Sequence, residues 1–440
     1  MQGQALPGFR DFYPPEAALR NHIFSAWREV AARYGFEEYD GPPLEALELY
    51  TEKSGEEIVG QLYHFEDKGG RTVALRPEMT PTLARMVAAR AQALKKPIRW
   101  FSMPQLFRYE RQQRGRLREH FQLNMDLLGE SGPLADAEII AAGLDVLRVL
   151  GFGPEDVRAR VSDRRIVSAL VVRWAGMPEA AVPAALAVLD KCERAEESEL
   201  RAQVVRHLAS HGAGVGGVAI APEETARRVL AIAGIRGREA LLAHLREAGC
   251  LEQAEPLLET VDALEAMGLG AFVDVDLSIV RGLAYYTGVV FELFDARKQL
   301  RAICGGGRYD DLLEGLGGPA LPAVGFGMGD VVLGELLKRR GVAPAPAATL
   351  DAFLVAVTAA DVPPVLQLAH QLRDRGVRVE FSLRPQGLAK QLKLAAARAA
   401  RRAVIVGPDE RAAGAVLVRD LAAGSETTMT LESLLDAFPR

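Results

Sequence analysis

The sequence predicts an α+β fold for the larger part of the chain and a smaller α/β domain at its C-terminal end. Strand-like segments fall in two blocks, one before residue 130 and one after residue 270, and helices are interleaved with them unevenly. Such clustering favours a mostly antiparallel sheet, because a doubly wound parallel sheet needs a helix after nearly every strand. Beyond residue 350 strand and helix patterns alternate regularly, which is typical of a parallel sheet.

Size and composition indicate a globular chain of two or three domains, with 440 residues of which 49% are hydrophobic and 25% charged. The net charge of −5 excludes no class of partner, because basic groups can gather locally. Cys192, Cys250 and Cys304 are far apart, which favours a reducing compartment and argues against a disulfide scaffold or a zinc site. The first residues carry no signal pattern and no run is long enough to span a bilayer, so we expect a cytoplasmic protein.

The first block of strands follows an amphipathic helix. Apolar residues recur at helical spacing from Leu19 to Tyr34, and Gly35 ends the pattern. An extended segment at residues 37–44 comes next. Residues 62–66 and 71–76, joined by a Gly-Gly turn, then predict a hairpin.

A strand-to-helix turn follows this hairpin, in the stretch LRPEMT. Pro77 stops the strand, and Thr80 can cap a helix that begins at residues 81–82 and runs to residue 93. This leaves Glu78 and Thr80 on the turn, where polar side chains can face a ligand. Capping alone would account for Thr80, and a surface glutamate needs no special role.

The segment at residues 107–129 predicts two antiparallel strands with an unusual choice of polar side chains. Alternation places Arg108 and Glu110 on one face of its first strand. Its second strand has Gln122, Asn124 and Asp126 on one face. The opposite face is apolar: Phe121, Leu123, Met125 and Leu127. A solvated face would usually carry Lys, Glu and Thr, so this polar face is typical of a pocket floor.

The loop of this hairpin is strongly basic. Around Gly115 it holds Arg111, Arg114, Arg116 and Arg118. Guanidinium groups suit a polyanion such as a phosphate chain. An ordinary edge hairpin with a charged tip is an equally good interpretation of these residues alone.

Helical patterns dominate the middle of the chain. A helix at residues 136–150 is followed, from about residue 166 to residue 268, by a region rich in Ala, Leu, Glu and Arg with few strand formers. We interpret this region as a helical insertion. The run GAGVGG at residues 212–217 has no phosphate-loop Lys-Ser/Thr after it, so a flexible linker is the better interpretation.

The second block of strands returns after the insertion. Strand patterns lie at residues 271–279, 289–294, 301–304 and 322–328, and a helix is expected at residues 329–339. Three glycines, Gly305 to Gly307, follow the third of these strands. They would let the backbone approach a ligand closely, or they form a tight structural turn.

A Pro/Ala-rich linker at residues 341–350 precedes the last domain, residues 351–440. Strands are predicted at residues 352–357, 378–381 and 403–406, and helices at residues 364–375 and 388–400. This domain has 12 Lys and Arg against 10 Asp and Glu, so it carries +2 while the rest of the chain carries −7. The basic residues form a solvated helix face or a weak nucleic-acid footprint.

Five stretches together resemble one family. They are LPGFRDFYP (6–14), ALRPEMT (74–80), FRYERQQRGRLREHFQLNMDLLG (107–129), IVRGLAYYTG (279–288) and GGGRYDDL (305–312). The chain resembles histidyl-tRNA synthetase, a class II aminoacyl-tRNA synthetase, over essentially its whole length. The resemblance implies an antiparallel-sheet catalytic domain formed by residues 1–165 and 269–340. It also implies that residues 166–268 are the family's insertion domain and residues 351–440 its anticodon-binding domain.

The resemblance also implies a reaction and its partners. Such an enzyme joins histidine to ATP, giving histidyl-adenylate and pyrophosphate, and then transfers histidyl to the terminal ribose of tRNA(His). Mg²⁺ would bridge the ATP phosphates, with no tightly bound metal site in the protein. We expect a homodimer formed through class II motif 1, here around residues 20–45.

The resemblance assigns roles to individual side chains. Arg108, in class II motif 2, would hold the α-phosphate and the substrate carboxylate, and Arg281 would stand on the other side of the α-phosphate. Glu78 and Thr80 match residues that hold the amino group of histidine. The rest of the implied histidine pocket is Gln122, Asp126, Tyr285, Tyr286 and Tyr309. The implied ATP site is Arg108, Glu110, Arg116, Arg118, Gly305, Gly306, Gly327 and Gly329.

Three positions depart from the family pattern. Motif 3 usually ends G-x-x-x-G-[LV]-E-R, with the arginine on the ATP γ-phosphate, but Val332 stands in its place here. Asp126 stands where Glu is commoner, and Ala284 where Asp is commoner. The first departure removes a phosphate contact, and the other two are milder.

The main alternative is the synthetase-like regulatory subunit of ATP phosphoribosyltransferase, which does not aminoacylate. The missing motif 3 arginine favours it. The C-terminal domain and the preserved pair Arg108 and Arg281 argue against it. A pure tRNA-binding module is a third possibility, but a complete amino-acid pocket would be superfluous there.

Overall fold

A nine-stranded, mostly antiparallel sheet forms the centre of the larger part of the chain, as expected. The computed structural model describes residues 3, 5–51, 60–110, 115–211, 221–281, 285–342 and 350–438. In spatial order the strands are β1 (Glu37–Glu38), β5 (Ile98–Ser102), β7 (Glu119–Leu128), β12 (Ala323–Gly329), β11 (Cys304–Arg308), β10 (Val289–Asp295), β8 (Val157–Asp163) and β9 (Val273–Val275), with β6 (Gln105–Phe107) paired to β7. Only the edge pairs β1–β5 and β8–β9 are parallel.

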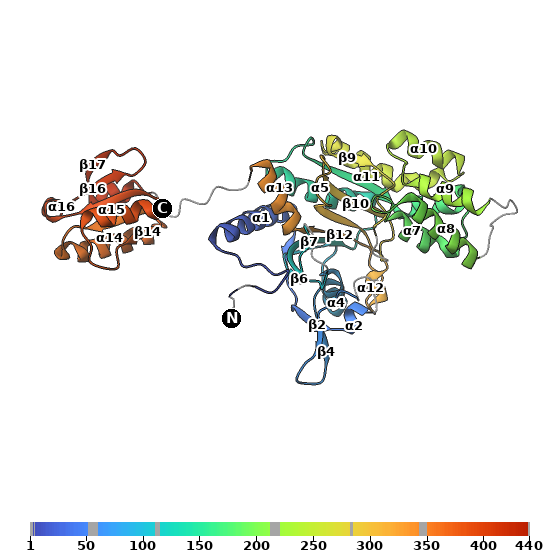
Figure 1. Ribbon diagram of the computed structural model, residues 1–440, viewed down its shortest axis with the longest axis horizontal. Helices are drawn as coiled ribbons and strands as arrows, with labels where there is room; N and C mark the ends of the chain where they lie inside the picture. The colour runs from blue at the N-terminus through green and yellow to red at the C-terminus, as the bar shows by residue number, and fades with distance from the viewer. Residues whose placement is uncertain are drawn as a thin grey trace. The chain divides into compact units, whose positions relative to one another are not determined.

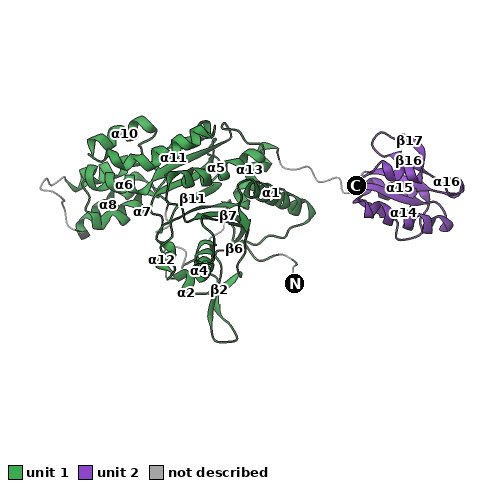
Figure 2. Ribbon diagram, turned by 180° about the vertical axis from the view of Figure 1, so that it is seen from behind, with its two compact units in different colours: residues 1–343 green, residues 344–440 purple. Residues whose placement is uncertain are grey.

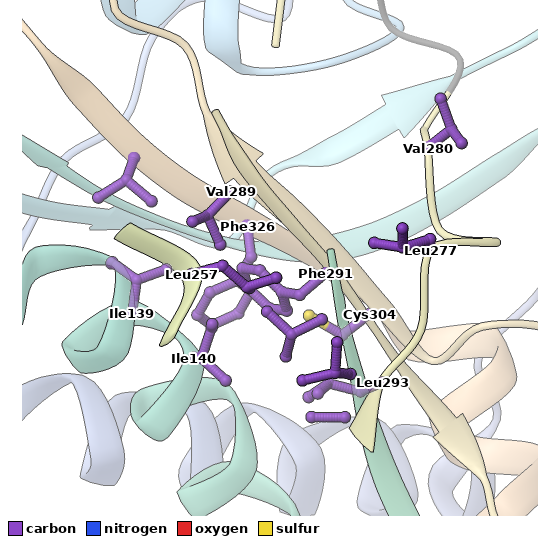
Figure 3. Packing of buried hydrophobic residues seen from close by; sticks show 14 of the residues in the cluster. Ile139, Ile140, Leu257, Leu277, Val280, Val289, Phe291, Leu293, Cys304 and Phe326 are labelled. Carbon is purple, nitrogen blue, oxygen red and sulfur yellow. The ribbon is translucent and has the colours of Figure 1, made fainter. Parts of the chain in front are cut away.

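Helices cover the apolar face of this sheet (Figure 1). They are α1 (Pro14–Arg33), α5 (Pro133–Val149), α11 (Glu255–Ala266) and α13 (Asp330–Arg340). Figure 3 shows Ile139 and Ile140 of α5 beside Phe291 of β10 and Phe326 of β12, whose ring centroids are 6.4 Å apart. This packing holds the sheet rigidly, so the side chains on its other face have fixed positions.

The predicted faces of β7 are confirmed. Leu123, Met125 and Leu127 are buried in the main core, while Asn124 and Asp126 point to the opposite face. Register fixes the neighbours of that polar face, because Asp126 pairs with Gly325 and Asn124 with Gly327 of β12.

A small three-stranded sheet stands beside the large one, with the order β2 (Leu44–Ala46), β4 (Thr72–Leu75), β3 (His64–Glu66). The predicted hairpin is therefore confirmed. Short helix α2 (Glu48–Thr51) and α4 (Thr80–Arg90) accompany it. Thr80 does not cap α4 as expected. The helix begins at Thr80 and its N-cap position is Met79, and the Thr80 hydroxyl hydrogen-bonds Tyr285 instead.

The chain from residue 164 to residue 272 is mostly helical where the structure describes it. Its helices are α6 (Arg164–Ala169), the π-helix η1 (Leu170–Trp174), η2 (Glu179–Ala181), α7 (Val182–Leu189), α8 (Glu197–His211), α9 (Pro222–Ile232), α10 (Arg238–Glu247), η3 (Leu251–Ala254), α11 and η4 (Gly270–Phe272). The predicted linker at residues 212–217 lies outside the described residues. The strand expected at residues 271–279 is shorter, because η4 occupies its first residues and only Val273–Val275 pairs with β8.

The glycine run is where the predicted strand boundaries are wrong. We expected a strand at residues 301–304 with the glycines after it, but β11 begins at Cys304 and contains all three glycines. The reason is close packing. A Cβ on Gly306 would overlap Gly325 O and Phe326 of β12, so only glycine allows this pairing. Helix α12 (Leu312–Gly315) follows, and the predicted helix at residues 329–339 is α13.

The chain divides into two compact units, Met1–Ala343 and Pro344–Arg440 (Figure 2). The second unit has a five-stranded sheet ordered β14 (Val379–Phe381), β13 (Leu350–Ala356), β15 (Ala400–Val406), β16 (Ala415–Asp420), β17 (Glu426–Thr430). Its helices are η5 (Ala359–Asp361), α14 (Val362–Asp374), α15 (Leu388–Ala397), α16 (Pro408–Ala413) and α17 (Leu431–Asp436). The first three strands are parallel as predicted, whereas β16 and β17 add antiparallel strands that were not expected.

Among the described residues no helix is both long enough and apolar enough to cross a membrane.

Candidate active site

Two cavities meet on the polar face of the large sheet. The larger has a volume of about 520 Å³ and the smaller about 70 Å³. Both are lined by the same five residues: Arg108, Gln122, Arg281, Gly305 and Gly327. Residues from β7, β11 and β12 thus form a common floor, and arginines from distant parts of the chain stand at the boundary between the cavities.

Arg108 reaches this boundary from the chain segment that follows β6. Its backbone N–H donates to Arg118 O at 2.9 Å, which continues the pairing of β6 with β7. Its Nε donates to Pro77 O at 2.9 Å, in the turn before α4. The guanidinium group is therefore held against the turn that also carries Glu78.

Arg281 reaches the boundary from the chain segment between β9 and β10. Its backbone has φ +60°, a left-handed conformation that is uncommon for a residue with a side chain. Its Nη1 donates to Glu292 of β10, and its buried Nε has no hydrogen-bond partner among the described residues. A Cβ on Gly305 would collide with this guanidinium, so glycine at position 305 allows Arg281 to lie across β11.

The smaller cavity ends in a buried carboxyl and a tyrosine. The Tyr309 hydroxyl donates to Asp126. Burial raises the pKa of Asp126 to about 7, and the hydrogen bond from Tyr309 opposes part of this rise. Near neutral pH this carboxyl can therefore exist in either form. In both forms it retains oxygen lone pairs that can accept a hydrogen bond from an N–H group of a ligand.

Two further tyrosines complete the walls of the smaller cavity. The Tyr285 hydroxyl donates to Glu78 Oε2 at 3.2 Å and also hydrogen-bonds Thr80. Burial raises the pKa of Tyr285 well above its ordinary value, so the hydroxyl remains a donor. The Tyr285 ring lies 5.1 Å from the ring of Tyr286 and 5.9 Å from that of Tyr309, measured between centroids. The result is a small pocket with aromatic sides and polar ends.

Comparison with known proteins identifies relatives of this chain. A family model described as histidyl-tRNA synthetase matches residues 8–329, and a model described as an anticodon binding domain matches residues 351–440. A histidine–tRNA ligase of Opitutus terrae is 45% identical over 98% of this chain and 97% of its own length. The chain belongs to the histidyl-tRNA synthetase family.

Further relatives and solved structures are also similar to this chain. A histidine–tRNA ligase of Natronomonas pharaonis is 40% identical over 99% of this chain and 96% of its own. The crystal structure of the histidyl-tRNA synthetase from Nostoc aligns with a TM-score of 0.81, 24% identity, and coverage of 100% of this chain and 99% of the other. A Bacillus halodurans structure titled as an ATP phosphoribosyltransferase regulatory subunit/histidyl-tRNA synthetase aligns with a TM-score of 0.74, 22% identity, and coverage of 92% and 99%. At these identities both structures indicate the fold alone.

Most residues that the synthetase resemblance singled out line the two cavities. The smaller one is lined by Glu78, Thr80, Gln122, Asp126, Tyr285, Tyr286 and Tyr309. The larger one is lined by Glu110, Arg116, Gly305, Gly327 and Gly329, in addition to the two shared arginines.

Arg118 and Gly306 do not line either cavity. The Arg118 guanidinium lies 4.2 Å from the ring centroid of Tyr109, and its Nε donates to Glu110 O at 3.3 Å. Gly306 is enclosed by β12. Within the hairpin loop, Arg116 donates from Nη2 to Glu110 Oε1 at 2.9 Å, whereas residues 111–114 lie outside the described part of the chain.

Several polar residues that line the cavities were not assigned from the sequence, among them Asn124, Glu292, His120 and Arg301. Asn124 lines the smaller cavity, although its place on the polar face of β7 was predicted. Glu292 and His120 line the larger one. A charged residue inside the apolar strand VVFELF was the available signal for Glu292. For His120, burial and the nearby charge of Arg108 lower the pKa to about 3, so its imidazole is neutral.

Val332 lines the larger cavity at the start of α13. Its Cγ2 would lie 3.6 Å from a Cβ placed on Gly115 of the hairpin loop, and it packs against the main core. Position 332 therefore offers an apolar surface to the cavity where the synthetase family usually presents an arginine. Ala284 lies outside the described residues.

Proposed function

We propose that this chain acts as a histidine–tRNA ligase, with histidine in the smaller cavity and ATP in the larger one. A carboxylate oxygen of histidine attacks the α-phosphorus, and the bond from that phosphorus to the bridging oxygen of pyrophosphate breaks. A hydroxyl of the terminal ribose of tRNA(His) then attacks the carbonyl carbon of histidyl-adenylate, and AMP leaves.

The observation that carries this proposal is the position of Arg108 and Arg281. They are separated by more than a third of the chain, yet both line both cavities. A phosphorus atom at the boundary between bound histidine and ATP would have a guanidinium group on each side. Positive charge at that place stabilises the negative charge that develops in the in-line transition state.

Histidine selection follows from the polar ends of the smaller cavity. Glu78 and Thr80 would hold the α-amino group, and Gln122 would contact the substrate nearby. Asp126, hydrogen-bonded by Tyr309, would accept a hydrogen bond from an imidazole N–H. An amino acid without that N–H would leave the buried carboxyl with its Tyr309 hydrogen bond but without the one from the substrate, which weakens its binding.

In the larger cavity, Glu110 and Arg116 of the hairpin and the open glycine positions Gly305, Gly327 and Gly329 would accommodate ATP. Mg²⁺ arrives with the nucleotide and neutralises part of the phosphate charge. We assign Arg118 and Gly306 indirect roles. Arg118 shapes the hairpin loop through Tyr109, and Gly306 keeps β11 against β12.

The second unit would bind the anticodon region of tRNA(His), consistent with its match to an anticodon binding domain. Its basic residues give the electrostatic attraction that nucleic acid requires. These are Arg384, Lys390, Lys393, Arg398, Arg401 and Arg402. We also propose a homodimer and a cytoplasmic location. The latter is supported by three free cysteines.

The alternative of a regulatory subunit of ATP phosphoribosyltransferase has one observation in its favour, the apolar Val332. Two observations favour the ligase. A curated relative named histidine–tRNA ligase is 45% identical over 98% of the chain, and the second unit matches an anticodon binding domain.

The decisive experiment is histidine-dependent exchange of pyrophosphate into ATP, followed by charging of tRNA(His). Purified protein should catalyse both reactions, and histidine should not be replaceable by glutamine or phenylalanine. Histidine binding without exchange would favour the regulatory subunit. Arg281→Ala protein from the same preparation controls for a contaminating synthetase, because exchange that persists undiminished in it would come from another enzyme.

A further inference from the structure

The ATP cavity lacks a cation on α13, the helix from which the family usually supplies one. Val332 replaces the arginine, and the basic residues of α13 are all in its last turn: Lys338, Arg339 and Arg340. Arg339 bonds Glu335 and Gln299, and Arg340 bonds Asp295 and Asp156. The distal phosphates of ATP carry most of its charge, so a cation is needed near this end of the cavity.

A second segment of the chain lies along α13 at this place. Ile303 O accepts a hydrogen bond from Gly329 N at 3.3 Å, at the start of the helix. Gln299 Oε1 accepts one from Arg339 Nη1 at 3.2 Å, in the last turn. The segment from 299 to 303 therefore contacts α13 both at its start and in its last turn.

Arg301 is the central residue of that segment. Its side chain is exposed and lines the same cavity as Val331 and Val332 of α13. The cavity thus has Arg108 and Arg281 at its boundary with the smaller pocket, and Arg301 on the side of α13.

Two other arginines line this cavity. Arg116 lies on the hairpin and forms an ion pair with Glu110. Arg194 follows α7 and donates to Asp190, both to its carbonyl at 3.0 Å and to its carboxylate at 3.2 Å. Neither belongs to the segment from 299 to 303. Arg301 is therefore the cavity-lining arginine on the segment that contacts both ends of α13.

We propose that Arg301 binds the β- and γ-phosphates of ATP, in place of the arginine that the family usually carries at position 332. The inference rests on the proposed function, because it requires ATP in the larger cavity. Val332 then serves as an apolar surface against Gly115, and the phosphate contact comes from the neighbouring segment instead of the helix.

The test compares ligands with and without the distal phosphates, in Arg301→Ala and wild-type protein. Calorimetry would measure binding of a non-hydrolysable ATP analogue and of a non-hydrolysable histidyl-adenylate analogue, both with Mg²⁺. We expect the ATP analogue to bind about tenfold to a hundredfold more weakly, because one charge-assisted contact is lost. Binding of the adenylate analogue should change less than about twofold, because it has no distal phosphates.

Matched variants separate this role from its alternatives. Arg297→Ala removes an exposed arginine four residues away that lines neither cavity, and it should bind both ligands as the wild type does. Arg301→Lys retains the charge and should lose less ATP affinity than Arg301→Ala. Equal weakening of both analogues in Arg301→Ala would overturn the inference, because it would indicate a general structural role. A larger selective loss in Arg194→Ala would overturn it as well.

Exchange kinetics distinguish failure of this inference from failure of the proposed function. If wild-type protein catalyses histidine-dependent exchange and Arg301→Ala has an unchanged KM for ATP, Arg301 is not the phosphate contact and the ligase assignment stands. If the wild-type protein shows no exchange, the proposed function fails and this inference fails with it.

Discussion

Arg281 has a left-handed backbone conformation, and this conformation turns its side chain back over the sheet. Its φ of +60° is unfavourable for a residue with a Cβ, and such positions gather at functional sites. Glu292 holds the guanidinium, and the missing side chain of Gly305 leaves space for it. Glu292 of β10, the left-handed backbone at residue 281 and the absent side chain of Gly305 together fix the guanidinium charge at the boundary of the two cavities.

The first prediction concerns this charge. Arg281→Ala should lower the rate of histidine-dependent exchange by about a hundredfold or more, because the guanidinium stabilises a charge that exists only in the transition state. The dissociation constant of histidine, measured by calorimetry, should change much less. Equal losses in rate and in histidine affinity would contradict this role. Arg297→Ala provides the control for loss of an arginine elsewhere.

The second prediction uses the titration of Asp126. Its pKa in the folded chain is about 7, above the ordinary value of 3.8, because burial favours the neutral form. The folded chain therefore holds a proton that the unfolded chain releases, and the contribution of Asp126 to stability decreases as the pH rises from about 4 to about 7. Ionised Asp126 is the stronger acceptor for an imidazole N–H.

We therefore expect Asp126→Asn to weaken histidine binding by about tenfold at a pH near 8, and much less at a pH near 6, where the wild-type carboxyl is itself mostly protonated. Free histidine also titrates in this range, but it does so identically for both proteins, so the ratio of dissociation constants isolates Asp126. A ratio that stays constant with pH would contradict the assignment.

At the scale of elements, β11 explains why glycines occur in a central strand. Each of its three glycines meets a neighbour that leaves no room for a side chain: Arg281 at Gly305, β12 at Gly306, and Val289 O of β10 at Gly307. In the sequence, a run of three glycines does not distinguish a strand from a turn, because glycine is depleted in ordinary strands. Only the neighbours reveal that this one is a strand.

The third prediction contrasts two glycines. Gly306→Ala should lower the free energy of unfolding by about 2 kcal/mol, because its Cβ would overlap backbone atoms of β12. Gly334→Ala in α13 should raise it by about 0.5 kcal/mol, because its Cβ would make ordinary contacts at 3.7 Å with Leu19 and 3.8 Å with Ile23 while improving helix propensity. Scanning calorimetry of the first unit would measure both. Two shifts of the same sign would contradict the packing argument.

At the scale of the whole molecule, each unit has its own hydrophobic core. In the second unit, alternate residues of β13 enter two separate clusters on opposite faces of the sheet, Ala352 and Leu354 on one and Phe353 and Val355 on the other. Both cavities are lined only by residues of the first unit. We therefore expect amino-acid activation and recognition of the anticodon region to be separable.

The fourth prediction tests that separation. A chain truncated after Ala343 should fold and keep histidine-dependent exchange close to the wild-type rate, because its core and both cavities are intact. Its charging of tRNA(His) at limiting tRNA should fall by about tenfold or more, because one of two linked contacts with the tRNA is lost. Loss of exchange upon truncation would show that the second unit supports the catalytic site.

The fifth prediction concerns assembly. The edge strand β1, Glu37–Glu38, lies within the region expected to form motif 1, and both of its residues are exposed at one end of the large sheet. Light scattering at micromolar concentration should give the mass of two chains. The mass of a single chain would contradict the homodimer.

The sequence by itself determined which faces of the elements are apolar, because periodicity is a local property. The faces of β7, the antiparallel class of the large sheet and the parallel start of the second unit all followed from it, and the five family stretches placed Arg108, Arg281 and the pocket tyrosines together. Tertiary structure alone decided which partner each polar group has: Glu292 for Arg281, Tyr285 for Thr80, and Tyr109 for Arg118. It also decided that the glycine run is a strand and that Arg301 lines the same cavity as Val332. These facts depend on contacts between segments far apart in the chain, and no local pattern records such contacts.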